Sequence, residues 1–192
     1  MSVVSALDDI FERLAALGRP VAQRKRNGLS STIVAKRFSD VGLHCHPDVV
    51  AAYAASDGTD SCAGDTIGDL SLFPGYYWLP LHEVFEVYEA ISSHATWSQD
   101  WVPLFASGGG DFYAVVCSDK EIAFGSMVGY LIGEPDIYIE FPTLGAMIET
   151  VRRSYHEGAF FASQEGLEAD YGAMRRIAVE VSPTFLPFAA GA

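Results

Sequence analysis

The stretch from Trp101 to Phe141 constrains the fold more than any other part of the sequence. It consists of aromatic and β-branched runs separated by short clusters of Gly, Ser and Asp, a pattern that predicts strands joined by tight turns. The segment 107–111 reads Ser-Gly-Gly-Gly-Asp and suits a hairpin turn, because glycine adopts positive φ without strain. A second turn is expected at Asp119–Glu121. The stretch therefore predicts an antiparallel meander of three or four strands.

Helices are expected to cover this sheet, because its predicted strands are too apolar for a face left in water. Amphipathic patterns with start and stop signals predict helices at 5–17, 31–41, 48–56, 80–92 and 143–155. A last helix is expected to contain Leu167 and Ala178 and to end at Ser182, and a short strand is expected at 70–73. The apolar tail 184–188 is expected to dock on the core.

The length and composition indicate one domain. A chain of 192 residues, 49% of them hydrophobic, is long enough to bury a substantial core. The fold class that follows is α+β: a single domain over residues 1–192, with a mostly antiparallel central sheet flanked by helices. No apolar run is long enough for a membrane span, and acidic residues such as Asp8 near the N-terminus argue against a secretory signal. Three cysteines without paired spacing predict reduced thiols and a cytoplasmic location.

The charge of the chain is strongly negative and unevenly distributed. Its formal net charge is −13, yet residues 1–40 hold seven basic and four acidic side chains. Between Arg37 and Lys120 no Lys or Arg occurs, against twelve carboxylates. A surface of this kind repels nucleic acid and anionic lipid and attracts basic partners, although solubility alone explains it equally well.

The densest carboxylates of this cation-free segment form the predicted partner-binding face. On the helix expected at 80–92, the glutamates lie opposite the apolar side, and a loop rich in aspartate precedes it. Two tyrosines between the loop and the helix are candidate apolar anchors, with burial in the core as the alternative. The residues of this face are Glu83, Glu86, Glu89, Asp57, Asp60, Asp65, Asp69, Tyr76 and Tyr77.

The sequence offers three candidate sites for catalysis, metal or phosphate, and each has a structural alternative. His44, Cys45, His46 and Asp48 are the only cluster of candidate ligands, and an outside alternative is a metal-dependent hydrolase built on them. Pro47 makes this segment a helix start, so we expect no metal and no cofactor there. The glycine triplet lacks the following helix and lysine of a phosphate loop. The basic triplet 24–26 is read as a solvated loop, with phosphate contact as the alternative.

The order of several short motifs resembles the SUKH superfamily, which includes bacterial immunity proteins and fungal regulators of cell-wall synthesis. The motifs are Trp101-Val102-Pro103, Gly109-Gly110-Asp111 and Gly125. The similar region is about 42–155, with a helical extension over 1–41 and a C-terminal helix and docking tail over 164–192. The resemblance implies a mixed α+β domain that acts by binding, in many bacterial relatives by neutralising a toxin, often a nuclease, in the cytoplasm.

These observations lead to a functional expectation. We expect a non-enzymatic, acidic binding protein, with a basic toxin domain as the partner and immunity as the role. The alternative is a regulatory or scaffold protein of the cell-wall-regulator type. The charge supports the first expectation independently of the resemblance, since a nuclease site is basic and an acidic protein would meet it quickly.

Overall fold

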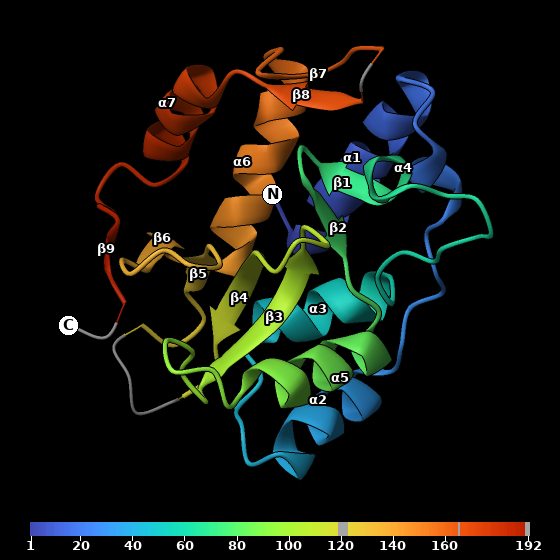
Figure 1. The fold of residues 1–192 in the computed structure, drawn as a ribbon. Helices are drawn as coiled ribbons and strands as arrows, with labels where there is room; N and C mark the ends of the chain where they lie inside the picture. The colour runs from blue at the N-terminus through green and yellow to red at the C-terminus, as the bar shows by residue number, and fades with distance from the viewer. Residues whose placement is uncertain (119–122, 165, 191–192) are drawn as a thin grey trace.

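A meandering antiparallel sheet forms the centre of the protein and is larger than the sequence predicted. The structure is a computed structural model that describes residues 1–118, 123–164 and 166–190. In that part of the chain seven strands pair in chain order, from β1 to β6 and then β9 (Figure 1). They are β1 (Ser71–Phe73), β2 (Tyr76–Trp78), β3 (Trp101–Ala106), β4 (Phe112–Val116), β5 (Met127–Tyr130), β6 (Tyr138–Phe141) and β9 (Phe188–Ala189).

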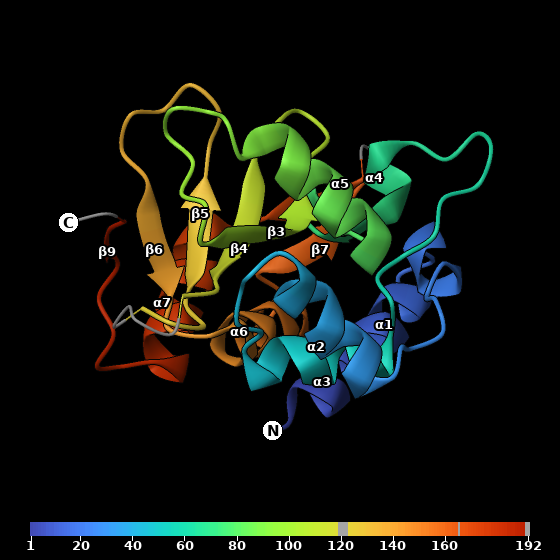
Figure 2. The same ribbon diagram turned by 90° about the horizontal axis from the view of Figure 1, so that it is seen from below.

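Helices flank this sheet, so the protein has the single-domain α+β fold that the sequence predicted. In Figure 2, α1, α2, α3 and α6 lie on one side of the strands. The helices are α1 (Val3–Ala16), the 3-10 helix η1 (Pro20–Gln23), α2 (Ser31–Asp40), α3 (Pro47–Ala55), α4 (Ile67–Leu70), α5 (Leu81–Ile91), α6 (Leu144–His156) and α7 (Tyr171–Val181). A separate two-stranded sheet joins β7 (Phe160–Ala162) and β8 (Leu167–Ala169).

The predicted hairpin around the glycine triplet is confirmed. Strands β3 and β4 pair antiparallel, with Ala106 opposite Phe112 at the turn. Gly108 and Gly110 have φ of 76° and 104°, values that side-chain-bearing residues rarely adopt. Asp111 lies in the turn, and its carboxylate accepts a hydrogen bond from the backbone N–H of Ile132 at 3.0 Å. The second predicted turn, 119–121, lies outside the described residues.

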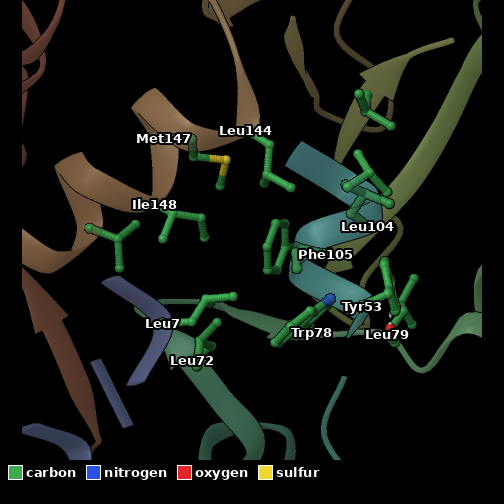
Figure 3. Close-up of a cluster of buried hydrophobic side chains, with 14 of the residues drawn as sticks. Leu7, Tyr53, Leu72, Trp78, Leu79, Leu104, Phe105, Leu144, Met147 and Ile148 are labelled. Atoms are coloured by element: carbon green, nitrogen blue, oxygen red, sulfur yellow. Dashed lines mark hydrogen bonds between the residues drawn. The ribbon is translucent and has the colours of Figure 1, made fainter. Parts of the chain in front are cut away.

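The main core lies between the helices and one face of the sheet. Leu7 of α1 and Met147 of α6 meet Trp78 and Phe105 from the strands there, and all four are buried (Figure 3). Tyr53 of α3 closes the cluster, and its hydroxyl donates a 2.9 Å hydrogen bond to the carbonyl of Leu79. Cores of this size provide most of the stabilisation of a domain, because burying one large apolar side chain contributes about 1.5–3 kcal/mol.

The opposite face of the sheet is covered by a second, smaller cluster of apolar side chains. Trp97, in the segment between α5 and β3, lies over Trp101 and Tyr130 with ring centroids 5.8 and 5.0 Å away. The tail adds Phe185 to this second cluster. A tryptophan-bearing loop and the tail therefore cover this face, whereas helices cover the other one. The expected docking of the tail is confirmed, since Phe188 of β9 pairs with Ile139 of β6.

Two predicted element boundaries were wrong. The last helix begins at Tyr171, because Asp170 caps it by accepting a 2.9 Å hydrogen bond from the N–H of Ala173, and Leu167 belongs to β8. Leu70, predicted as the start of a strand, ends the short helix α4. In both places the apolar pattern alone did not distinguish a helix from a strand, and a capping aspartate decided the outcome.

Candidate functional site

Helix α5 holds the three predicted glutamates on a rigid frame. Leu81, Val84 and Phe85 are buried on its inner side. Glu83 is partly exposed, and Glu86 and Glu89 are exposed on the outer side. This arrangement is the one that the helical period predicts.

The outer carboxylates of α5 have few neighbours of opposite charge. Glu83 lies 3.9 Å from Nε2 of His82. Within residues 1–118, 123–164 and 166–190, Glu86 and Glu89 form no ion pair. Arg37 of α2 approaches the helix, but its guanidinium lies over the ring of Phe85, 5.2 Å from the centroid. The negative charge of α5 therefore faces solvent.

The predicted loop aspartates, in contrast, are engaged within the chain. Asp65 forms a 2.9 Å ion pair with Nε of Arg24, and this hydrogen-bonded partner lowers the pKa of the carboxyl. Asp60 pairs with Arg26 at 3.1 Å. The basic triplet therefore meets the acidic loop, a pairing that neither reading of the triplet anticipated. The opposite charges of the two segments were the available signal, but nothing in the sequence showed that they meet.

The two remaining loop aspartates have helix-capping roles. Asp69 forms a capping box with Thr66 at the start of α4, and the N–H of Thr66 lowers the pKa of its carboxyl. Asp57 is buried, and its Oδ1 accepts a 2.7 Å hydrogen bond from the N–H of Leu81 at the start of α5. Neither residue adds free charge to the glutamate face.

The two tyrosines lie on opposite faces of β2. Tyr77 is on the side of Glu83, and burial, with a smaller effect of that carboxylate, raises the pKa of its hydroxyl. Tyr76 stacks on Phe73, with ring centroids 5.3 Å apart, and lines a cavity described below. The structure thus places Tyr77 near Glu83, the first of the three glutamates on α5, whereas Tyr76 lies on the other face of β2.

The candidate ligand cluster at residues 44–48 has structural contacts. His46 caps α3, its Nδ1 accepting a 3.2 Å hydrogen bond from the N–H of Asp48. Oδ2 of Asp48 accepts from the N–H of Gly145 in α6 at 3.1 Å. Burial raises the pKa of the Cys45 thiol to about 12, which disfavours the thiolate that metals bind. In the described part of the chain, no three His, Cys, Asp or Glu side chains are placed to share a metal. The absence of a metal stays a prediction.

Comparisons with known proteins do not assign this chain to a family. No family model matches this sequence, and no curated protein shows a significant match to it. The resemblance to the SUKH superfamily therefore rests on the order of motifs alone and stays a prediction. Among the described residues, no helix combines the length and the apolar character that crossing a membrane requires.

Proposed function

We propose that this chain is a non-enzymatic cytoplasmic binding protein whose glutamate face meets a basic protein, and that the partner is a toxin domain that it neutralises. The glutamate face is the outer side of α5, with Glu83, Glu86 and Glu89, together with the neighbouring Tyr77. The observation that carries the proposal is the contrast between this face and the loop beside it. The loop carboxylates have partners within the chain, whereas Glu86 and Glu89 have none among the described residues.

The physical argument for a protein partner has two parts. Unpaired carboxylates on one helix face speed the encounter with a basic surface, and their rigid backbone limits the entropy lost on binding. Tyr77 offers an aromatic surface beside them, and aromatic residues often dominate binding energy at interfaces. The motif order of the sequence supports the immunity role, and the three free thiols, Cys45, Cys62 and Cys117, fit a reducing compartment.

The role is tested with the protein encoded immediately upstream of this gene. Its C-terminal domain is expressed in a bacterial host, alone and together with this chain. Neutralisation predicts that the domain arrests growth alone and that co-expression restores growth. Growth arrest that persists despite co-expression contradicts the proposal. A stable complex with a harmless partner favours the scaffold alternative.

The binding face is tested by removing its charge. The variant Glu83→Gln/Glu86→Gln/Glu89→Gln is expected to fold normally, because exposed positions contribute little to stability. It is expected to associate more slowly with the partner and to show a weaker dependence on salt. Association rates at low and high salt provide the measurement.

A matched control removes the same charge elsewhere. Glu134→Gln/Asp136→Asn/Glu168→Gln alters three exposed carboxylates that lie outside α5 and the 57–69 loop. This variant keeps the local charge of the glutamate face, so we expect its association to stay close to that of the wild type. If the two triple variants behave alike, net charge rather than this face governs the encounter.

A further inference from the structure

A large cavity lies beneath α7, against the sheet. Its volume is about 680 Å³, within the range of small-molecule sites. The walls come from β1, β2, β4, β5, β6, α6, β7, α7 and the tail, and they are mostly apolar. Representative wall residues are Phe73, Tyr76, Met147, Phe160, Met174 and Phe185.

A β-bulge in β6 places Glu140 and Phe141 on the same side of the sheet, where Glu140 lines this cavity. Along β5 and β6, Val128 pairs with Ile139 and Met127 with Phe141, so Glu140 is an extra residue without a partner on β5. Phe141 belongs to the helix-covered core, and Glu140 lines the cavity on that same side. A regular strand would place these two consecutive side chains on opposite faces.

The carboxylate of Glu140 fits into the space left by a glycine, and it accepts only one hydrogen bond from the described residues. The hydroxyl of Tyr113 donates to Oε2 at 3.0 Å. Oε1 lies over Gly129, where a Cβ would approach it to 2.2 Å, so any larger residue at 129 would collide with the carboxylate. No residue in the described part of the chain donates a hydrogen bond to Oε1.

The electrostatics leave this carboxylate incompletely compensated. Burial raises the pKa of Glu140, against the smaller opposing effects of the Tyr113 hydrogen bond and the charge of Arg175. Arg175 of α7 also lines the cavity, yet within residues 1–118, 123–164 and 166–190 Glu140 has no ion-pair partner. A partly buried carboxylate with one donor is unfavourable for folding unless something else binds it.

We propose that this cavity binds a small apolar molecule that carries a primary ammonium group, with the ammonium held by Oε1 of Glu140. An ammonium supplies the missing donors and the opposite charge in one group. The rings of Tyr76 and Tyr113, with centroids 4.8 Å apart, flank the carboxylate side and present faces that attract a cation. The apolar body of the ligand fills the space toward α6 and α7.

The test uses two fluorescent probes that differ only in the amine. Dansylcadaverine has an apolar fluorophore joined by an alkyl chain to a primary amine, and N-pentyl dansylamide lacks that amine. Emission rises when the fluorophore leaves water, so titration gives both affinities. We expect the amine probe to bind at least about tenfold more tightly, as a charge-assisted hydrogen bond implies. Equal affinities, or no binding of either probe up to its solubility, would overturn the proposal.

Three variants test whether the probes bind in this cavity and beside Glu140. Glu140→Gln is expected to bring the affinity of the amine probe within about twofold of that of the neutral probe, because the charge is gone but the cavity stays. Glu86→Gln removes the same charge on α5 and is expected to leave both affinities unchanged. Ala178→Phe fills the cavity from α7 and is expected to weaken both probes. Circular dichroism and melting curves establish that each variant is folded.

The results of the probe titrations do not depend on whether the proposed partner-binding function is correct. The triple glutamine variant of α5 is expected to bind both probes as the wild type does. A loss of the preference for the amine in Glu140→Gln with unchanged partner association supports the cavity site alone. An amine probe that binds Glu140→Gln as tightly as the wild type would refute the role of this carboxylate.

Discussion

The carboxylate of Asp57 accepts a 2.7 Å hydrogen bond from the backbone N–H of Leu81, and this contact fixes the start of helix α5. The same carboxylate lies 3.3 Å from Nε of Arg26. A residue predicted to face a partner is thus buried and supports the helix that carries the glutamate face. The local structure of α5 depends on a residue 24 positions earlier in the chain.

This contact predicts that replacing Asp57 lowers stability much more than replacing the nearby Asp60. Asp57→Ala is expected to lower the free energy of unfolding by about 1–3 kcal/mol, because it leaves a buried N–H without a partner. Asp60→Ala is a matched control, since Asp60 also pairs with Arg26 but is exposed. It is expected to change stability by less than about 0.5 kcal/mol. Urea unfolding measures both, and similar losses would contradict the capping role.

The glycine triplet shows what a sequence predicts well. The hairpin turn between β3 and β4 follows from local backbone chemistry, because a run of glycines between apolar strands favours a turn with positive φ. The sequence predicted positive φ at Gly109 or Gly110. The structure assigns it to Gly108 and Gly110 and not to Gly109.

Two substitutions in this turn are therefore expected to differ. Gly110→Ala places a side chain at φ 104° and within 2.9 Å of Cδ1 of Ile132, so we expect a loss of about 1–3 kcal/mol in unfolding free energy. Gly109→Ala meets nothing closer than 3.5 Å and is expected to change stability by less than about 1 kcal/mol. Thermal melting curves measure the stability of both variants. A larger loss at Gly109 would show that the turn is built differently.

The metal prediction can be tested at Asp48, whose carboxylate links α3 to α6 through Gly145. Asp48→Ala is expected to lower stability by about 1 kcal/mol, and Asp48→Asn by less, because asparagine keeps an acceptor oxygen. Added zinc is expected to leave the melting temperature of the wild type unchanged. Elemental analysis that finds nearly one equivalent of zinc in the purified protein would refute a purely structural role.

Long-range contacts explain why the cavity and the ion pairs were not predicted. The cavity depends on how β6 meets α6 and α7, and the bulge at Glu140 depends on how β5 and β6 pair, which no single segment of the sequence shows. In the same way, Arg24 and Asp65 are 41 residues apart, and only the fold brings them together. The glutamates of α5 were placed correctly on an outer face, since the helical period is a local property.

The partly buried carboxylate of Glu140 predicts that the stability of the protein depends on pH. Burial raises the pKa of Glu140 in the folded protein above that in the unfolded chain. Between the two values the folded protein binds more protons, so the stability contributed by this group is lost as pH rises through the folded pKa. At about pH 7, Glu140→Gln is expected to be more stable than the wild type, on the order of 1 kcal/mol, since glutamine keeps an acceptor for Tyr113 without the charge. At about pH 4 the wild-type carboxyl is protonated, and the difference should largely disappear.

A second variant separates the effect of the Glu140 charge on stability from the effect of its hydrogen bond with Tyr113. Tyr113→Phe removes the hydroxyl that donates to Oε2 of Glu140 at 3.0 Å, so the carboxylate loses its donor. This variant is expected to be less stable than the wild type at about pH 7, by about 1–3 kcal/mol, and to recover part of that loss when Glu140 is protonated. Urea midpoints at both pH values, measured without added amine, provide the comparison. If Glu140→Gln is instead the less stable protein at neutral pH, the charge of Glu140 is already compensated within the fold, and the argument that it awaits a cation loses its basis.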